Sequence, residues 1–487
     1  MKQLLIKIAS ALALFFTLLS CQSEIVKINT ASGAIEIPSE EFLEIVGEAY
    51  FYGYPLVLMD YTKKVSTNIE SPDPMRPFAP VNQIGHFRVF PDHNLTTVVK
   101  PNVDAYYSIV WFNLREEPQV FSMPATERYY LLPFMDAYSN VFASPGTRTT
   151  GTKAQDILLA GPKWKGEVPE GLQLIQAPSE TVWMLGRIQV NSPEDGSTTV
   201  RAIQDKMRLV PLSAFGKKEY VSPKGTFETE NVNIVPVKEL RNLDINAYFD
   251  KVLHLMKENP PSAKDSLIVN KMERIGLIPG NKAQLHSDSF IINKKLQVLP
   301  EFIHKKMEDR RANPDPNLIF NGWTVIYENI GTYGTDYKRR AFIDFIGLGA
   351  NIPEDAVYPN LTYDINGNPL DAGTDYQIHF EADKLPPVDA FWSLTAYNKN
   401  EFLVKNDLNR FALGDRDDLI YNKDGSLDLY IQSSPTAKEK LNNWLPIPET
   451  GPFYLTLRLY WPKEKVLKGN WNPPLVSHQN KKNSNSI

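Results

Sequence analysis

Residues 101–114 read PNVDAYYSIVWFNL, and this stretch indicates how the first half of the chain folds. Its β-branched and aromatic residues are typical of a β-strand. If the segment is extended, Asn102, Asp104 and Tyr106 share one face, because successive side chains of a strand alternate. Similar short runs, punctuated by Gly, Pro and Asn, continue to about residue 238. Their spacing predicts a β-sandwich rather than alternating strands and helices.

The pattern of the chain changes twice after this β-rich region. Apolar residues fall at helical spacings from about 239 to 350, and β-like runs return afterwards. The sequence therefore predicts a multidomain α+β protein with an N-terminal β-sandwich, a middle helical domain and a C-terminal β-sandwich or jelly roll. The expected limits are 38–238 for the first domain with a helix at its start, 239–350 for the helical domain, 351–476 for the last domain and 477–487 for a disordered tail.

Two of the expected helices contain proline. The first covers 39–52, with Ser39 as its N-cap, and we expect Gly53 and Pro55 to end it. A later one covers 289–311, and we expect it to be bent or broken at Pro300.

The first twenty residues have the order of a secretory signal peptide. A short positive stretch is followed by the apolar run 8–19, which is too short to span a bilayer permanently. The sequence Leu18-Leu19-Ser20-Cys21 resembles a bacterial lipobox, which implies cleavage before Cys21 and lipidation of its thiol. The alternative is an ordinary signal peptide followed by a chance cysteine.

We therefore expect a signal peptide over 1–20 and a linker over 21–37, with the membrane as a partner through lipidated Cys21. Gln22 does not resemble an inner-membrane retention signal, which favours an outer membrane lipoprotein of the cell envelope. The signal leaves open whether the protein faces the periplasm or the outside.

The composition is that of a globular protein, with 42% hydrophobic and 22% charged residues among 487. Cys21 is the only cysteine in the sequence, so an intramolecular disulfide is excluded, and a chain of this size can fold without one. The net charge of −5 argues against a general nucleic-acid surface. The oligomeric state, including a homo-oligomer, stays open.

Common catalytic and metal-binding signatures are missing. The sequence has no H-E-x-x-H, G-x-S-x-G or G-x-x-x-x-G-K-[ST] motif, and we expect no cofactor and no metal. His86 and His93 are seven residues apart, which would place them on opposite faces of one strand, so we interpret them as a hydrogen-bonded loop histidine and an exposed histidine rather than a metal pair.

Polar residues alternate along a second strand-like segment, LLPFMDAYSN at 131–140. Asp136, Tyr138 and Asn140 share a face there, and Arg148 follows in a loop rich in Gly and Thr. Such groups can hydrogen-bond a saccharide or an organic acid. The candidate ligand-binding residues are Asn102, Asp104, Tyr106, Asp136, Asn140 and Arg148. The candidate catalytic pair is Asp104 and Asp136, as general acid and base.

A structural role is the competing interpretation of the same residues. In that case Asp104 and Asp136 pair with Arg128 and Arg148 to hold loops in place.

The C-terminal part presents a similar choice. Thr456, Arg458 and Tyr460 share a strand face that either meets water or contacts another domain. We expect Trp444 and Trp471 to fix their proline-rich loops to the domain rather than stack on sugars. The loop 406–418, NDLNRFALGDRDD, is interpreted as a salt-bridged surface loop rather than a calcium site.

Several of these segments resemble the DUF1254 and DUF1214 domains. The first resemblance rests on PNVDAYYSIVWFNL, RYYLLPFMDAYSNVFASPGTRTTGT and ILLAGPKW, and the second on PPVDAFWSLTAYN, NRFALGDRDDLIYNKDGSLDLYIQ and NWLPIPETGPFYLTLRLYWPK. The resemblance implies a β-sandwich, a helical and a jelly-roll-like domain, and it supplies no catalytic residues. The positions that fit the family pattern are His86, Asn102, Asp104, Tyr106, Asp136, Asn140, Arg148, Tyr333, Asp336, Arg410, Arg458 and Tyr460.

These observations lead to three hypotheses for the function. The first is an envelope lipoprotein that binds a small polar ligand, either a saccharide or an organic acid. The second is a hydrolase or lyase that uses Asp104 and Asp136. The third is a structural or assembly protein whose polar strand faces meet neighbouring domains or subunits.

Overall fold

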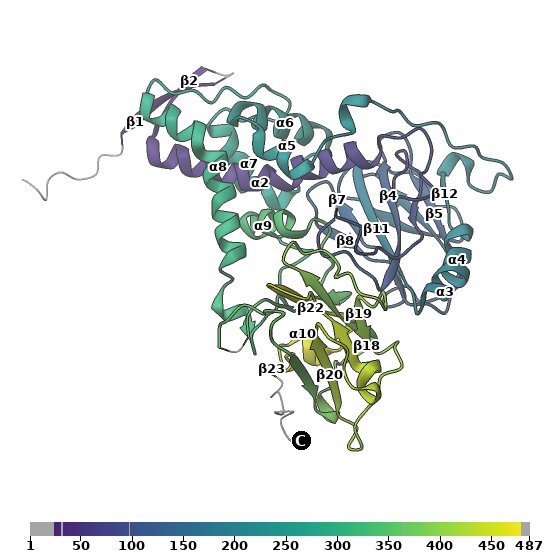
Figure 1. Cartoon of the computed structure of the whole chain (residues 1–487). Helices are drawn as coiled ribbons and strands as arrows, with labels where there is room; N and C mark the ends of the chain where they lie inside the picture. The colour runs from purple at the N-terminus through teal and green to yellow at the C-terminus, as the bar shows by residue number, and fades with distance from the viewer. Residues whose placement is uncertain (1–23, 31–32, 97, 365, 479–487) are drawn as a thin grey trace, which may run out of the picture. The chain divides into compact units, whose positions relative to one another are not determined.

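The structure, a computed structural model, describes residues 24–30, 33–96, 98–364 and 366–478 (Figure 1). The chain divides into two compact units. The helical unit contains the described part of 1–57 together with Leu240–Lys305, and the sheet unit contains Leu58–Glu239 and the described part of 306–487. The expected signal peptide, Cys21 and residues 479–487 of the expected tail lie outside the described residues.

The helical unit begins with a hairpin and continues with helices. Strands β1 (Ile25–Thr30) and β2 (Gly33–Pro38) pair antiparallel. Helix α6 (Ile245–Glu258) starts where the Asp244 carboxylate accepts hydrogen bonds from the backbone N–H groups of Asn246 and Ala247. The other helices of this part are α2 (Ser39–Ser66), α5 (Pro236–Asn242), α7 (Ser266–Arg274) and α8 (Phe290–Ala312), of which α2, α5 and α8 continue into the sheet unit.

Two helices continue through a proline. Helix α2 continues through Pro55 to Ser66, so the expected end at Gly53 and Pro55 was wrong, and α8 continues through Pro300 to Ala312 without a break. A proline inside a helix removes one hydrogen bond and costs about 3 kcal/mol. Residues on both sides of Pro55, including Tyr54 and Leu56, are buried, so packing of the helix offsets this local cost.

The first half of the sheet unit consists of two sheets packed face to face. The β4 sheet has the order β3-β4-β11-β7-β8, with β6 also beside β11, and the β5 sheet has the order β10-β9-β5-β12. Their strands are β3 (Gly85–Phe87), β4 (Ala105–Asn113), β5 (Gln119–Met123), β6 (Tyr130–Leu131), β7 (Phe134–Asp136), β8 (Val141–Ala143), β9 (Gln155–Ala160), β10 (Leu172–Gln176), β11 (Thr181–Gln189) and β12 (Arg208–Pro211).

Alternation along these strands builds the core between the two sheets. Val110 and Phe112 on β4 and Val182 on β11 pack with Phe121 on β5 and Ile157 on β9. The residues between them on β4 and β11 face the opposite side of the β4 sheet. The side chains on this opposite face are therefore not part of the core between the two sheets.

The second half of the sheet unit repeats this plan. The β22 sheet has the order β13-β14-β16-β22-β18-β19, with β15 also beside β22, and the β20 sheet has the order β21-β20-β17-β23. Buried Leu455, Leu457 and Leu459 of β22 form the core with residues of the β20 sheet. The strands are β13 (Ile319–Phe320), β14 (Trp323–Thr324), β15 (Ala356–Val357), β16 (Asn360–Leu361), β17 (Tyr376–Phe380), β18 (Val388–Asn398), β19 (Ala412–Gly414), β20 (Leu427–Gln432), β21 (Trp444–Pro446), β22 (Phe453–Pro462) and β23 (Val476–His478).

Helices complete the sheet unit. Helix α9 (Tyr337–Gly347) is capped by the Asp336 side chain, which accepts from the backbone N–H of Arg339. The short helices are α3 (Pro193–Asp195), α4 (Arg201–Lys206) and α10 (Glu464–Leu467). The α+β class with sheet-rich regions before and after a helical region is confirmed. Among the described residues, none of the helices combines the length and the apolar character needed to cross a membrane.

Candidate functional site

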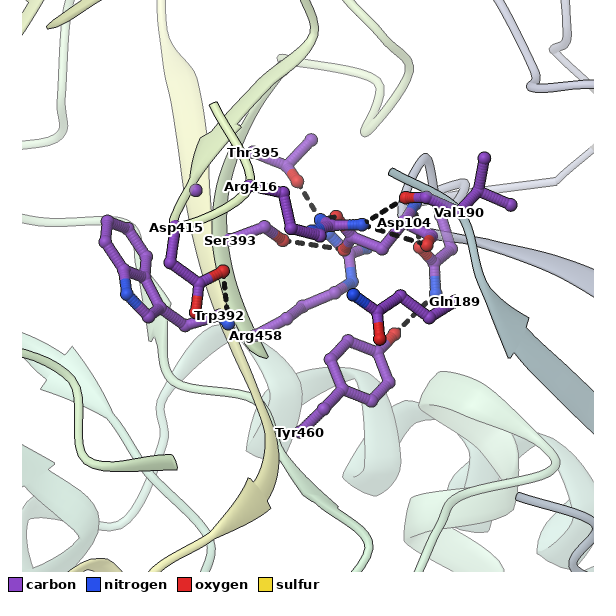
Figure 2. A network of polar contacts seen from close by, with 12 residues as sticks. Asp104, Gln189, Val190, Trp392, Ser393, Thr395, Asp415, Arg416, Arg458 and Tyr460 are labelled. Carbon is purple, nitrogen blue, oxygen red and sulfur yellow. Dashed lines mark hydrogen bonds and ion pairs between the residues drawn. The ribbon is translucent and has the colours of Figure 1, made fainter. Parts of the chain in front are cut away.

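Asp104 stands immediately before strand β4. Its backbone N–H donates to the Asn102 side-chain oxygen at 2.7 Å, which forms a turn at the start of the strand. Its buried carboxylate accepts a hydrogen bond from the Ser393 hydroxyl of β18 at 2.6 Å and forms an ion pair with Arg416 (Figure 2). Asp104 therefore connects the β4 sheet to the β22 sheet, and we call this contact region the junction.

Arg416, in the loop after β19, is the positively charged partner of Asp104 at the junction. Its guanidinium also donates to the backbone carbonyls of Val190, at 2.6 Å, and of Asp104, at 3.1 Å (Figure 2). It lies over the Phe391 ring, 4.2 Å from the ring centroid. The loop that follows β19 is thus held to the ends of β4 and β11 by Arg416, while Asp415, Asp417 and Asp418 beside it are exposed.

Arg458 is a second buried arginine of the junction, on strand β22. It donates to the Thr395 hydroxyl at 2.7 Å, the Tyr397 phenol at 2.5 Å and the Lys100 carbonyl at 3.2 Å. No carboxylate pairs with it among the described residues. The polar face of β22 thus makes a contact with another domain, which was one of the two options that the sequence left open.

Arg187 is a third buried arginine, on strand β11. Its guanidinium donates to the Asn351 side chain at 2.8 Å and to the Leu185 carbonyl at 3.0 Å, and it lies over the Tyr107 ring. Within the described part of the chain, Arg187 has no carboxylate partner, and its Nε has no hydrogen-bond acceptor. A buried positive charge without a counter-ion is energetically expensive.

Phenols and amides lie close to these arginines. Asn102 donates to the phenols of Tyr460, at 2.7 Å, and of Tyr107, at 3.1 Å. Asn351 donates to the Tyr358 phenol at 2.6 Å. Burial raises the pKa of Tyr460 well above 10 and also raises the pKa of Tyr358, so both phenols are neutral at pH 7.

The junction therefore contains more buried positive than negative charge. Asp104 forms its ion pair with Arg416, and its charge also acts on Arg458, whereas the hydrogen-bond acceptors of Arg187 and Arg458 are neutral groups. Asn102, Tyr107 and Tyr358 are only partly buried, so solvent reaches one edge of this group.

The same face of the β4 sheet carries two further unsatisfied donors. Trp111 of β4 and Trp183 of β11 stack with their ring centroids 4.9 Å apart. Both indole N–H groups are buried without a hydrogen-bond acceptor among the described residues. Buried donors of this kind normally have a partner, such as an ordered water or a ligand.

Asp136 belongs to a separate cluster. It ends β7 and accepts from the backbone N–H groups of Tyr138 and Asn140, both at 2.9 Å. Ser139, in the turn between β7 and β8, has a left-handed backbone with φ of 65° and donates to the Asp344 carboxylate at 2.6 Å. This turn is thereby attached to helix α9.

Burial changes the protonation of both carboxyl groups in this cluster. It raises the pKa of Asp344 to about 8, although the Ser139 hydroxyl and the Arg340 charge favour ionisation. It also raises the pKa of Asp136, against hydrogen bonds from Asn140 and the charge of Arg340. Asp344 is therefore largely protonated at pH 7.

The predicted ligand-binding residues do not come together in one site. Asp104 pairs with Arg416, whereas Arg148 pairs with Asp355 at 2.8 Å. The predicted partners of the two aspartates were also wrong, because Arg128 pairs with Asp195 at 2.5 Å.

The prediction that Asn102, Asp104 and Tyr106 share one strand face was also wrong. The turn at Asn102 ends the extended segment, and β4 begins only at Ala105. The Tyr106 ring therefore lies in the core, 5.3 Å from Phe90. Tyr107, which was not in the predicted site, joins Asn102 instead.

Family models match the two sheet-rich parts of this unit. Residues 81–211 match "Protein of unknown function (DUF1254)", and residues 355–464 match "Protein of unknown function (DUF1214)". The chain is a DUF1254 and DUF1214 domain-containing protein. The junction thus lies between the DUF1254 domain, which supplies Asp104 and Arg187, and the DUF1214 domain, which supplies Arg416 and Arg458.

A solved structure shares this fold. The VPA0106 protein from Vibrio parahaemolyticus is 25% identical, with a TM-score of 0.67, and the match covers 90% of this chain and 100% of that chain. A structure of an uncharacterized protein from Burkholderia cenocepacia is 11% identical, with a TM-score of 0.41, over 91% of this chain and 92% of that one. Comparison with curated proteins gives no match.

The other predicted features have structural positions in these domains. In the DUF1254 domain, His86 exchanges a hydrogen bond with the Ser108 hydroxyl at 2.9 Å, and burial lowers its pKa to about 4. No group of three or more His, Cys, Asp and Glu side chains in the described ranges is arranged to hold a metal ion.

The expectation that Trp444 and Trp471 fix their loops to the domain is confirmed. Their indole N–H groups donate to the Gln432 and Lys384 carbonyls at 2.9 and 3.0 Å, respectively.

Proposed function

We propose that this protein binds a small organic acid at the junction of its DUF1254 and DUF1214 domains. The observation that supports this function is the pair Arg187 and Arg458, both buried and both without a carboxylate partner in the described part of the chain. The phenols beside them are neutral at pH 7 and cannot supply the missing negative charge.

A carboxylate ligand fits this environment chemically. An arginine fork pairs with a carboxylate through two parallel N–H···O bonds. Phenols and amide groups of Tyr107, Tyr358 and Asn102 supply further hydrogen bonds at the partly exposed edge. A neutral saccharide would bring no negative charge to the two arginines, so their positive charge favours the acid.

The two alternative functions have less support. A carboxylate-dependent hydrolase or lyase would need Asp104 and Asp136 in one site, but Arg416 holds the first and the β7–β8 turn holds the second. A purely structural junction is the stronger alternative, because the Asp104–Arg416 pair already connects the two domains.

We further propose that this binding protein is an outer membrane lipoprotein anchored through Cys21. The support is the lipobox-like sequence and the absence of any other cysteine in the 487 residues. An envelope location would expose the junction to small acids outside the cytoplasm.

A thermal-shift screen tests the binding function. Mono-, di- and tricarboxylates are compared with neutral sugars, and the matching acid should raise the melting temperature, since a ligand at 100 times its Kd stabilises by about 2.7 kcal/mol. Arg187→Gln should abolish the shift. Arg128→Gln is the matched control, because Arg128 already has a carboxylate partner. No shift with any acid, or an equal shift in Arg187→Gln, would favour the structural alternative.

A further inference from the structure

The face of the β4 sheet that carries Arg187 extends away from the junction, within the sheet unit. Three cross-strand pairs follow one another along β4 and β11: Arg187 with Tyr107, Leu185 with Ile109 and Trp183 with Trp111. These side chains alternate with the core residues of the same two strands, so all six lie on one face of the sheet. We call this row of three pairs the strip.

Each pair of the strip has a different chemical character. At one end, the Arg187 guanidinium lies 5.2 Å from the centroid of the Tyr107 ring. Leu185 and Ile109 make the middle apolar. At the other end the two indole rings stack nearly parallel, with an angle of 7° between their planes. The strip is therefore positively charged at one end, apolar in the middle and aromatic at the other end.

Solvent reaches the strip along β4. Tyr107 and Ile109 are partly exposed, although both lie within this paired strand. The β11 side is covered, because Leu185 is buried and the backbone of Gly349 lies against it. A Cβ atom at Gly349 would be only 2.9 Å from the Leu185 side chain. A ligand on the strip would therefore lie over the residues of β4.

The two tryptophans give the observation that points to a ligand on the strip. Trp111 is 3% exposed and Trp183 is 7% exposed, and neither indole N–H has an acceptor in the part of the chain that the structure describes. A buried donor without an acceptor costs free energy, so such a group normally has a partner. Because both donors are neutral, the oxygen of a hydroxyl or carbonyl group fits them at a lower desolvation cost than a second carboxylate.

The spacing of the pairs sets the length of a ligand that reaches both ends of the strip. Trp183 precedes Arg187 by four residues, which span about 13 Å in a β-strand. An extended eight-carbon chain is about 10 Å long between its terminal oxygens, at about 3.6 Å for every three bonds. A hydrogen bond adds about 3 Å. A chain of about eight carbons therefore connects the arginine to the indoles.

We infer that the organic acid of this protein is a medium-chain acid with a hydroxyl or carbonyl oxygen at its far end. Arg187 binds the carboxylate, and Ile109 and Leu185 contact the chain. The indole N–H groups of Trp111 and Trp183 donate to the far oxygen, so the tryptophans determine specificity. The inference rests on the proposed binding of an organic acid and adds the class of acid to it.

Calorimetric titration with matched probes tests the far end of the site. The probes are octanoate, 8-hydroxyoctanoate and 1,8-octanediol. The hydroxy acid should bind about tenfold more tightly than octanoate, the order of magnitude expected for one buried hydrogen bond. Octanediol, which has no carboxylate, should not bind measurably. Trp111→Phe/Trp183→Phe keeps aromatic rings and removes both N–H groups, so the two acids should bind this variant with affinities within about twofold of each other.

Trp444→Phe is the matched control, because the indole N–H of Trp444 already donates to the Gln432 carbonyl. This variant should keep the tenfold preference for the hydroxy acid. Equal affinities of the two acids for the unmodified protein, or a preference that persists in the double variant, would overturn the inference.

Failure of this inference can be distinguished from failure of the proposed function. Octanoate binding that Arg187→Gln abolishes, without a preference for the hydroxy acid, would overturn the inference and support the function. Binding of short acids alone would have the same meaning. No binding of any acid would overturn both.

Discussion

Asp104 and Arg416 form an ion pair that joins the DUF1254 and DUF1214 domains, although 311 residues separate them in the sequence. Only 1% of the Asp104 side chain and 16% of the Arg416 side chain are exposed. Arg416 also reaches the carbonyl of Val190, so it contacts the ends of both β4 and β11. The two domains are therefore joined by buried polar contacts at the junction and are not independent modules.

The first prediction concerns this ion pair. Asp104→Asn should lower the free energy of unfolding by roughly 3–5 kcal/mol, because the substitution leaves the Arg416 charge largely buried without a counter-ion. Urea denaturation followed by circular dichroism measures the change. Asp205→Asn is the control, since Asp205 pairs with Arg88 but is 61% exposed, and its loss should stay below about 1 kcal/mol. Similar losses in the two variants would contradict the structural importance of the pair.

The second prediction compares buried Arg187 with partly buried Arg148, which differ in their partners. Arg187→Met should change the free energy of unfolding by less than about 2 kcal/mol, since lost hydrogen bonds are offset by removal of an uncompensated charge. Arg148→Met should destabilise by roughly 3–5 kcal/mol, because it leaves the buried Asp355 carboxylate unpaired. Urea denaturation of both variants without added acid provides the test. A larger loss for Arg187→Met would show that its charge is already compensated.

The sequence was sufficient to predict the fold class because its signals are local. Alternation along residues 105–113 and the helical spacing of 245–258 each report one element, and both elements formed. The continuity of α2 and α8 through Pro55 and Pro300 was not predictable in this way. It depends on burial against residues far away in the sequence, which a local pattern does not contain.

The candidate site was predictable only in part. Asn102, Asp104, Arg458 and Tyr460 were singled out from the sequence as polar candidates, and all four lie at the junction. Their partners could not be derived, because pairing across two domains depends on tertiary packing. Arg187 was missed, although a lone arginine in the apolar strand TVWMLGRIQ is a recognisable signal for a buried charge.

The third prediction concerns stability at high pH. The pKa of the Asp344 carboxyl is raised by burial to about 8 from an ordinary value of 3.8, so the folded state keeps a proton that the unfolded state releases between these values. Stability should therefore fall as pH rises from about 4 to 8, by up to about 1.4 kcal/mol per pH unit, and the contribution is lost above pH 8. Asp136, whose pKa is also raised, acts in the same direction.

Asp344→Asn tests this assignment. The amide is neutral at every pH and can accept the Ser139 hydrogen bond, so this part of the pH dependence should disappear. Chemical denaturation from pH 5 to pH 9 measures the slope for both proteins. An unchanged slope in the variant would show that Asp344 is ionised in the folded protein throughout this range.

The fourth prediction concerns low pH. Burial lowers the pKa of His86 to about 4 from 6.5, and the charge of Arg88 acts in the same direction. The unfolded state therefore binds the proton first, and the stability present above pH 6.5 should be lost as pH falls towards 4. His86→Asn should remove this contribution in denaturation experiments between pH 4 and 7. His254→Asn, at a histidine with a 69% exposed side chain, is the control and should leave the pH dependence unchanged.

The last prediction concerns Cys21, which lies outside the described residues. Cys21→Ser should prevent incorporation of a fatty-acid probe, because a serine hydroxyl cannot form the thioether of a lipidated cysteine. The protein should then leave the membrane fraction or keep its leader, since one apolar run of 12 residues is too short to span a bilayer stably. Metabolic labelling followed by cell fractionation measures both effects. Label that persists on the serine variant would exclude Cys21 as the lipidated residue, and unlabelled native protein would indicate an ordinary signal peptide.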